Sequence, residues 1–335
     1  MVSIFLYIPS IHLLLLSLIH FQTYKKRITF LSWVLLYFVF FVASAQDTTL
    51  ITSELSAPLT IGQTEGIIQR RLNTLVISSS VGYTATLTGL HFLWYANSPR
   101  NSFHFFDDNA EWKQVDKVGH FYTAYHISRL GVTAFGWTGM PRRKAIWWGG
   151  LMGIIFQTPI EILDGFSATY GASWGDLVAN TVGSGLLIGQ LLLSDEERIH
   201  PKFSFHPTSL ASLRPNLLGR NLLQQVLKDY NGQTYWFAFD IKPWLRKESR
   251  FPAWLCVSIG YGAANMLSAN DVSSRLAGFD PYRQYYLSLD VNLTRIPTRS
   301  RFLKNVFFLL NTIHIPAPAL QWNRIEGFKM HALYF

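Results

Sequence analysis

The stretch EWKQVDKVGHFYTAYHISRLG, residues 111–131, places three ionisable side chains at the start of a strongly apolar segment: Asp116, Lys117 and His120. Trp112 precedes Asp116 by four residues and His120 follows it by four, so in a helix these three share one face. Charged groups inside an apolar bundle are very costly unless they are paired. We therefore expect a helix over about residues 115–135 whose charges find partners on neighbouring helices.

Three further apolar segments predict the other helices of this bundle, at residues 73–97, 143–163 and 175–193. They contain many small residues, as in WWGGLMGIIF and NTVGSGLLIG, which allow helices to approach closely. We predict a bundle of about four helices over residues 73–195, after a polar lead-in at residues 46–72. We expect the bundle to be embedded in a membrane or associated with one.

The region from residue 196 to residue 335 changes to a period of two, which is typical of half-buried strands. The alternation predicts strands at four places: residues 234–241, 253–263, 284–293 and 327–335. Residues 301–313 predict an amphipathic helix. The predicted fold class is therefore α+β, with an apolar helical bundle followed by a β-rich C-terminal part.

The closing aromatic residue, Phe335, is typical of the last strand of outer-membrane barrels. Two observations argue against a barrel made by this chain alone: about four strands are too few to close one, and Lys329 and His331 share a strand face with Phe335. We expect instead a sheet that packs on the helices or rests at a membrane surface.

The composition is that of a membrane-associated protein: 49% of the residues are hydrophobic, 15% are aromatic and only 15% are charged. The formal net charge is +9, but the basic residues are scattered, and the densest groups, at 24–27 and 141–144, flank apolar segments. This distribution argues against nucleic-acid binding. The single cysteine, Cys256, excludes an intramolecular disulfide and a cysteine-based zinc cluster.

The first 45 residues are predicted to be a targeting region. Residues 28–45 follow a basic KKR and end in Ala-Ser-Ala, which predicts a secretory signal peptide cleaved after Ala45. A second apolar run, residues 2–21, precedes it and is either a membrane helix or an extension upstream of a true start near Tyr24. Under both hypotheses the chain is exported. No cysteine follows the apolar core of the signal, so we expect no lipid on a processed N-terminal cysteine.

Two further pairs of polar residues lie on the later helices. Glu161 and Asp164 are three residues apart, and Asp176 and Asn180 are four apart, so each pair shares a helix face. The candidate polar site consists of Asp116, Lys117, His120, Glu161, Asp164, Asp176 and Asn180. His126 faces elsewhere and is interpreted as structural or interfacial.

Three hypotheses are compatible with this set of residues. The first is a buried polar network that sets the register of the helices. The second is a binding site for a lipid or glycan head group, or for a metal held by His120 with Glu161, Asp164 or Asp176. The third is a hydrolytic site, in which a carboxylate acts as general base and Lys117 or His120 stabilises a phosphate-like charge. No nucleotide-binding, serine-hydrolase or zinc-protease motif is present, and the cofactor remains unknown.

The segments DKVGHFYTAYHIS (116–128) and EILDGFSATYGASWGDLVANTVGSGLL (161–187) carry a resemblance. Together they resemble the YfiM-like family of predicted periplasmic lipoproteins, a domain of unknown function, and are more distantly similar to VanZ-like membrane proteins. The resemblance covers about residues 110–190. The positions that match are Asp116, Lys117, His120, Glu161, Asp164, Asp176, Asn180 and Gly183. The chain departs from the family pattern by lacking the lipoprotein cysteine and by adding the strand-rich C-terminal part.

The resemblance implies a cell-envelope protein without an established reaction; the VanZ-like branch is associated with tolerance of glycopeptide antibiotics. We expect an exported, membrane-associated protein that faces the periplasm, at either the inner or the outer membrane. Its polar site is expected to bind an envelope component or to be structural. The alternative is a hydrolase or transferase acting on an envelope lipid or glycan phosphate. Expected partners are a membrane lipid or envelope glycan, a second copy of the chain, or an outer-membrane protein.

Overall fold

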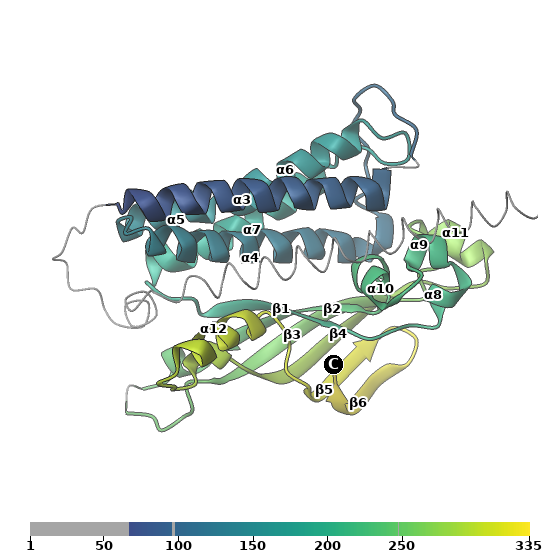
Figure 1. Ribbon diagram of the computed structural model, residues 1–335. Helices are drawn as coiled ribbons and strands as arrows, with labels where there is room; N and C mark the ends of the chain where they lie inside the picture. Colours follow the sequence, from purple (N-terminus) through teal and green to yellow (C-terminus); the bar gives the residue numbers. More distant parts are fainter. Residues whose placement is uncertain (1–66, 96–97, 247) are drawn as a thin grey trace, which may run out of the picture.

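The computed structural model describes residues 67–95, 98–246 and 248–335. The expected signal peptide and most of the polar lead-in lie outside these residues. The helical layer consists of α3 (Gln69–Leu90), extended by a π-helical turn (His91–Tyr95), α4 (Val115–Trp137), α5 (Arg142–Gly150), α6 (Met152–Gly165) and α7 (Trp174–Leu193). Figure 1 shows these helices stacked above a sheet formed by the C-terminal part. The α+β class is confirmed.

The segment predicted as one helix at 143–163 is two helices, α5 and α6, joined at Leu151. The join follows the pair Gly149-Gly150, and glycine weakens helices because it loses more backbone freedom than other residues. Gly149 also lies against the backbone of α4: a Cβ atom there would be 2.2 Å from the amide nitrogen of Val132. The glycines that allow close packing between α4 and α5 therefore also weaken the helix where it breaks.

The helices pack around α4 through small residues and a compact apolar cluster. A Cβ atom at Gly183 of α7 would be 2.2 Å from the carbonyl oxygen of Phe121, and one at Gly153 of α6 would be 2.2 Å from that of Ala124. The apolar cluster contains Tyr125, Ile146, Leu187, Ile188 and Leu191. The expectation that small residues in NTVGSGLLIG allow helices to approach closely is confirmed at Gly183, whereas Gly185 of the same segment has no neighbour within 4 Å of a Cβ atom.

The C-terminal part forms one antiparallel sheet of six strands in sequential order. The strands are β1 (Ile199–Phe205), β2 (Gln233–Asp240), β3 (Leu255–Ala264), β4 (Tyr282–Val291), β5 (Ala317–Asn323) and β6 (Gly327–Tyr334). The expectation of about four strands was wrong, because β1 and β5 were missed. Each contains a proline, Pro201 and Pro318, and proline argues against a strand when only the sequence is read.

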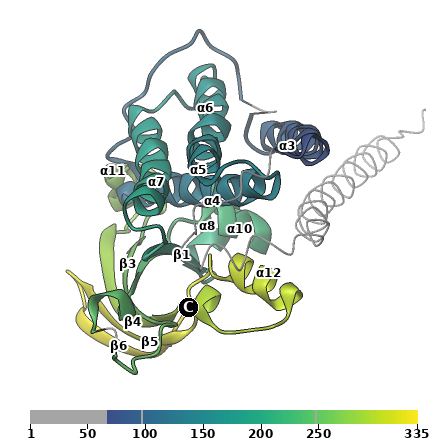
Figure 2. The same ribbon diagram turned by 90° about the vertical axis from the view of Figure 1, so that its left-hand side faces the viewer.

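Short helices border the sheet: α8 (Leu210–Leu213), α9 (Pro215–Leu218), α10 (Leu222–Lys228), α11 (Asp271–Leu276) and α12 (Arg301–Leu310). The last of these confirms the predicted amphipathic helix. The sheet is strongly curved, as Figure 2 shows. Val115 of α4 packs with Tyr235, Ala263 and Met266, so the expected packing of the sheet on the helices is confirmed.

The two faces of the sheet differ in character. The outer face carries Tyr235 and Phe237, which meet α4, and continues as exposed apolar side chains such as Ile259 and Leu287 on β3 and β4. The inner face carries Trp236, Tyr286 and Tyr334 together with many buried polar groups. Only part of the apolar outer face is therefore covered by the helical layer.

Two helical segments of the described residues are long and apolar enough to cross a membrane: Arg142–Gly165, which includes α5 and α6, and Trp174–Leu193. Of the most apolar windows in these segments, 33% and 39% of the residues are buried inside the molecule. Length and composition of this kind also occur in core helices and do not by themselves establish a span.

Candidate functional site

The candidate site forms where three helix ends meet. Asp116, Lys117 and His120 lie in the first turns of α4, Glu161 and Asp164 in the last turn of α6, and Asp176 and Asn180 in the first turns of α7. The positive ends of two helix dipoles therefore face the cluster and favour carboxylates there. The side chain of Gln157 on α6 also donates to the carbonyl oxygen of His120, at 3.1 Å. The structure thus brings the helices that carry the predicted residues together.

The entry to α4 is strained. Three consecutive residues, Trp112, Lys113 and Gln114, have positive φ angles of 47°, 53° and 64°. Such left-handed conformations cost about 1–2 kcal/mol per residue for side chains other than glycine. The prediction that Trp112 shares a helical stripe with Asp116 and His120 was wrong, because Trp112 precedes α4 and packs on Tyr230, with 5.0 Å between ring centroids.

Lys117 is the central cation of the site. Its Nζ lies 2.6 Å from Asp108 Oδ2, 2.9 Å from Asp176 Oδ1 and 3.2 Å from Asp116 Oδ2. Burial alone would lower the pKa of Lys117, but the carboxylates of Asp116 and Asp176 and the hydrogen bond to Asp108 outweigh it and raise the pKa above its ordinary value. Lys117 therefore stays charged and links α4 to α7.

His120 faces a second group of acceptors. Its Nδ1 lies 3.3 Å from Asn180 Oδ1 and 3.7 Å from Glu161 Oε1, and its Nε2 lies 3.8 Å from Asp176 Oδ1. Burial would lower the pKa of the imidazole, yet the charges of Asp116, Asp176 and Glu161 raise it overall. These contacts are longer than ordinary hydrogen bonds except for the one to Asn180, so the ring is loosely held.

The pKa values of two carboxyl groups at the end of α6 are raised. Burial raises the pKa of Glu161 to about 8 and that of Asp164 to about 6. Glu161 Oε2 accepts from the amide of Ser173, but Oε1 is buried and has no hydrogen-bond partner among the described residues. Asp164 accepts from the hydroxyl of Tyr95 at 2.7 Å. The carboxyl of Glu161 therefore holds its proton to a higher pH than an ordinary glutamate.

Asp116 and Asp176, which lie at the starts of α4 and α7, differ in the direction of their pKa shifts. Burial would raise the pKa of Asp116, but His120, Lys117 and a 2.7 Å hydrogen bond from Tyr230 hold it below its ordinary value. For Asp176, burial dominates and its pKa is raised in spite of His120 and Lys117. The amide of Asn180, Nδ2, is buried without a partner among the described residues. The site is thus only partly satisfied by its own side chains.

The pH dependence of stability should report on Glu161. Its pKa is about 4.5 when unfolded and about 8 when folded, so the folded state holds a proton that the unfolded state releases. This contribution is fully present below about pH 4.5 and is lost as the pH rises through about 8. We expect the free energy of unfolding to fall by a few kcal/mol between these limits, and Glu161→Gln to remove most of that fall and leave the smaller part that comes from Asp164, whose pKa is also raised.

This expectation is tested by urea unfolding at pH 5 and pH 8.5 in a chelator, with Glu248→Gln as a matched control because Glu248 is exposed. Glu248→Gln should keep the pH dependence of the natural chain. If Glu161→Gln keeps it too, the raised pKa of Glu161 is wrong.

Several residues of the site were not identified as such from the sequence. Ser173 Oγ donates to Asp108 Oδ1 at 2.6 Å. The hydroxyl of Tyr95 donates to Asp164, and that of Tyr230 donates to Asp116. Ser173 is the N-cap of α7, and its side chain accepts from the amide of Asp176. The proximity of Asp108 to the DKVGH motif was a signal for its role, but nothing in the sequence connects Tyr230 to Asp116. His126 Nε2 donates to the carbonyl oxygen of Pro201 at 2.9 Å, as expected for a structural residue.

A second buried polar cluster lies on the inner face of the sheet, away from the predicted site. Lys202 is fully buried, and its Nζ is 2.8 Å from Asp290 Oδ1, while His314 Nδ1 is 2.7 Å from Asp290 Oδ2. The ring of His314 stacks on Trp236 with centroids 3.8 Å apart. This triad has no solvent-exposed atom to offer a ligand and is interpreted as structural.

Residues 104–193 match the model of one protein family, described as predicted periplasmic lipoproteins (DUF2279). The matched segment includes all seven site residues predicted from the sequence and less than a third of the chain. The match supports an exported protein of the cell envelope, and it agrees with the resemblance to predicted periplasmic lipoproteins; the matched family is a domain of unknown function. It does not confirm the YfiM-like or the VanZ-like resemblance. No curated protein and no solved structure matches the chain.

Proposed function

We propose that this protein is a membrane-associated protein of the cell envelope that binds a divalent metal ion at its polar site, and through that ion an envelope component. One observation carries the proposal: ligand atoms of Asp116, His120 and Asp176 all lie within 4.8 Å of one another. An imidazole with carboxylates is a donor set that suits zinc, manganese or iron. Glu161 Oε1, buried and without a partner among the described residues, is a further oxygen ligand close to His120.

The charges of the site favour a cation over a bare phosphate. Five carboxyl groups, those of Asp108, Asp116, Glu161, Asp164 and Asp176, surround only Lys117 and His120. A metal ion would neutralise this excess and would release the proton that Glu161 holds. Lys117 lies 2.9 Å from Asp176 and competes with the ion for that carboxylate, so we expect moderate rather than tight affinity.

Metal titration of the purified full chain by calorimetry tests the proposal. His120→Ala is expected to weaken the binding of Zn²⁺ or Mn²⁺ by at least roughly tenfold, because it removes a direct ligand. Affinity in the natural chain should rise between about pH 6 and pH 8, since protons must leave His120 and Glu161 before the metal binds. His331→Ala, on the distant strand β6, is the matched control and should bind as the natural chain does.

The absence of saturable binding of either metal by the natural chain would refute the proposed site. Equal affinities for His120→Ala and His331→Ala would assign the bound metal to another place in the chain.

A hydrolase or transferase acting on an envelope lipid or glycan phosphate is the second candidate. The observation that favours it is the pKa of Glu161, about 8, which leaves this carboxyl able to donate a proton to a leaving group at neutral pH. The two functions separate at Glu161→Gln. A metal binder should lose little affinity, because Asp116, His120 and Asp176 remain and the amide keeps an oxygen ligand, whereas an enzyme that uses this carboxyl as its proton donor should lose activity by orders of magnitude.

A further inference from the structure

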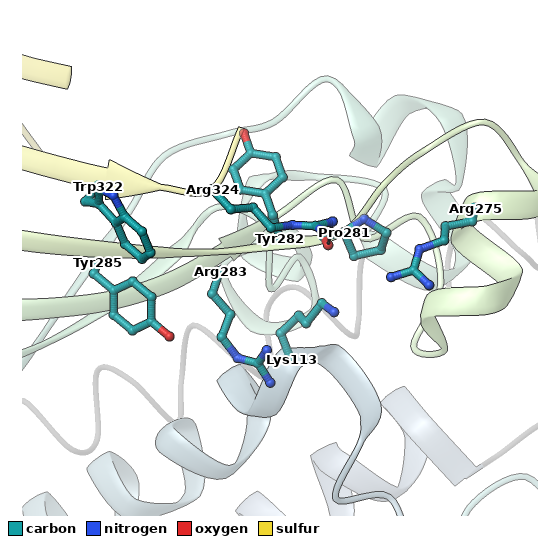
Figure 3. Close-up of a pocket in the computed structure, with 8 residues that line it drawn as sticks. All are labelled: Lys113, Arg275, Pro281, Tyr282, Arg283, Tyr285, Trp322 and Arg324. Carbon is teal, nitrogen blue, oxygen red and sulfur yellow. Dashed lines mark hydrogen bonds between the residues drawn. The ribbon is translucent and has the colours of Figure 1, made fainter. Parts of the chain in front are cut away.

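A basic cavity of about 270 Å³ opens beside the start of β4, away from the polar site. Figure 3 shows the side chains that line it. They come from α11, from the start of β4 and the residue before it, from the end of β5 and the turn after it, and from the strained segment before α4. Four of them are basic: Lys113, Arg275, Arg283 and Arg324.

The positive charge of this cavity is only partly neutralised. Among the described residues, the carboxylate of Asp271 pairs with Lys113 and Arg275, and that of Asp280 pairs with Arg275 and Arg324. Two carboxylates thus face four cations.

Of these four cations, Arg283 is the one without an ion pair to any described residue. It donates to the hydroxyl of Tyr261 at 3.1 Å and to the side-chain oxygen of Gln114. An arginine held by neutral acceptors keeps its full charge for a ligand, and its planar fork matches the oxygens of a phosphate.

The cavity adjoins the uncovered part of the apolar outer face. The row of the sheet next to it is aromatic and runs across four paired strands: Tyr261, Tyr285, Trp322 and Phe328. The next row on the same face is aliphatic: Ile259, Leu287, Leu320 and Met330. The exposed fractions are 49% for Ile259, 50% for Leu287, 37% for Leu320 and 80% for Met330.

The order of these layers is that of a membrane interface. Basic groups come first, an aromatic row follows, and an aliphatic surface lies beyond, as where protein meets lipid head groups and acyl chains. The strained entry to α4 supports the cavity directly, since Lys113 lines it and Gln114 holds Arg283. Strain retained at such a place is common where a ligand is bound.

We propose that this cavity binds the phosphate of an anionic phospholipid, with the acyl chains lying along the exposed outer face of β3 to β6. Arg283 and Arg324 contact the phosphate, and Tyr285 and Trp322 lie at the level of the glycerol. The sheet is thereby docked on the lipid surface by its outer face. The proposal does not depend on the metal site, because none of its residues belongs to that site.

Calorimetry on the full chain in a nonionic detergent tests this site with three probes: a short-chain phosphatidic acid, the phosphatidylcholine of the same chain length, and inorganic phosphate. We expect the phosphatidic acid to bind at least roughly tenfold more tightly than either of the others, because only it offers both an exposed anionic phosphate and apolar chains. If inorganic phosphate binds as tightly as the phosphatidic acid, the ligand of this cavity is the free anion and not a lipid. Equal binding of phosphatidylcholine would show that the charge is not recognised.

Variants then assign the binding to this cavity. Arg283→Gln should weaken phosphatidic acid roughly tenfold, and Arg324→Gln, whose side chain is 54% exposed, should weaken it with little risk to folding. Leu287→Asn should weaken the lipid but not phosphate, because it alters only the aliphatic row. Arg299→Gln is the exposed control and should bind normally. Unchanged affinity in both Arg283→Gln and Arg324→Gln, with melting temperatures like that of the natural chain, would overturn the proposal.

Discussion

Replacing Lys202 by Met is expected to destabilise the protein by about 3–5 kcal/mol, the largest single effect that we foresee. The Lys202 and Asp290 side chains are both fully inaccessible to solvent. Besides its 2.8 Å contact with Asp290, Lys202 Nζ donates to the carbonyl oxygen of Val291 at 2.7 Å. Removal of the ammonium leaves a buried carboxylate in the inner face of the sheet without its cation, although His314 Nδ1 still lies 2.7 Å from Asp290 Oδ2.

A second substitution distinguishes the loss of the buried ion pair from a simple loss of packing. Asp290→Asn in the Lys202→Met background removes the unpaired charge, so the double variant should recover part of the lost stability. Urea unfolding of the two single variants and the double variant completes the cycle. The control is Lys329→Met, because Lys329 is exposed and lies 3.8 Å from Glu326, where a surface pair contributes about 0–1 kcal/mol. A loss for Lys202→Met no greater than that of Lys329→Met would contradict the buried pair.

Gly183→Ala is expected to destabilise the protein by about 3 kcal/mol, because the added methyl group has no space. A Cβ atom there would be 2.2 Å from the carbonyl oxygen of Phe121, a backbone atom that cannot rotate away. Helix α7 would have to move from α4, and Asp176 and Asn180 would move with it. We therefore expect the substitution to weaken metal binding as well as folding.

The matched control for this substitution is two residues away on the same helix. At Gly185 a Cβ atom would meet nothing within 4 Å, so Gly185→Ala should be neutral or stabilise α7 by up to about 1 kcal/mol through helix propensity. Thermal unfolding and metal titration of both variants provide the comparison. Similar melting temperatures for the two variants would show that α4 and α7 do not pack as closely as described.

The helical layer was largely predictable from the sequence because its signals are local. Apolar runs with small residues predicted α4, α6 and α7, and spacings of three or four residues grouped Asp116 with His120 and Glu161 with Asp164. Such spacings define the face of one helix. The expectation that the charged residues would find partners on other helices followed from the cost of burying an unpaired charge.

The partners themselves were decided by tertiary structure. Asp108 bonds Lys117 across a turn, and Tyr230, which follows α10, donates to Asp116 from 114 positions away in the chain. No local pattern encodes such contacts, since they depend on how α4 packs against the sheet. The same holds for the left-handed entry at Trp112, whose backbone is held by a hydrogen bond from its amide to the carbonyl oxygen of Ala269.

Some strands of the sheet were likewise predictable from local sequence, and others were decided by tertiary contacts. Alternation alone predicted β2, β3, β4 and β6, and proline hid β1 and β5, which pair because their neighbours supply the hydrogen-bonding edge. The alternation also did not predict which face of the sheet is buried. Many polar side chains lie on the buried inner face, and many apolar side chains lie on the exposed outer face.

The sequence by itself therefore determined the α+β class and the seven polar residues of the helix ends, since periodicity and the cost of unpaired charge are local properties. Only the tertiary structure decided that Lys202 and Asp290 lie in a core and that Leu287 lies at the surface. The curvature of the sheet and its contact with α4 set that outcome, and they arise from contacts between segments far apart in the chain.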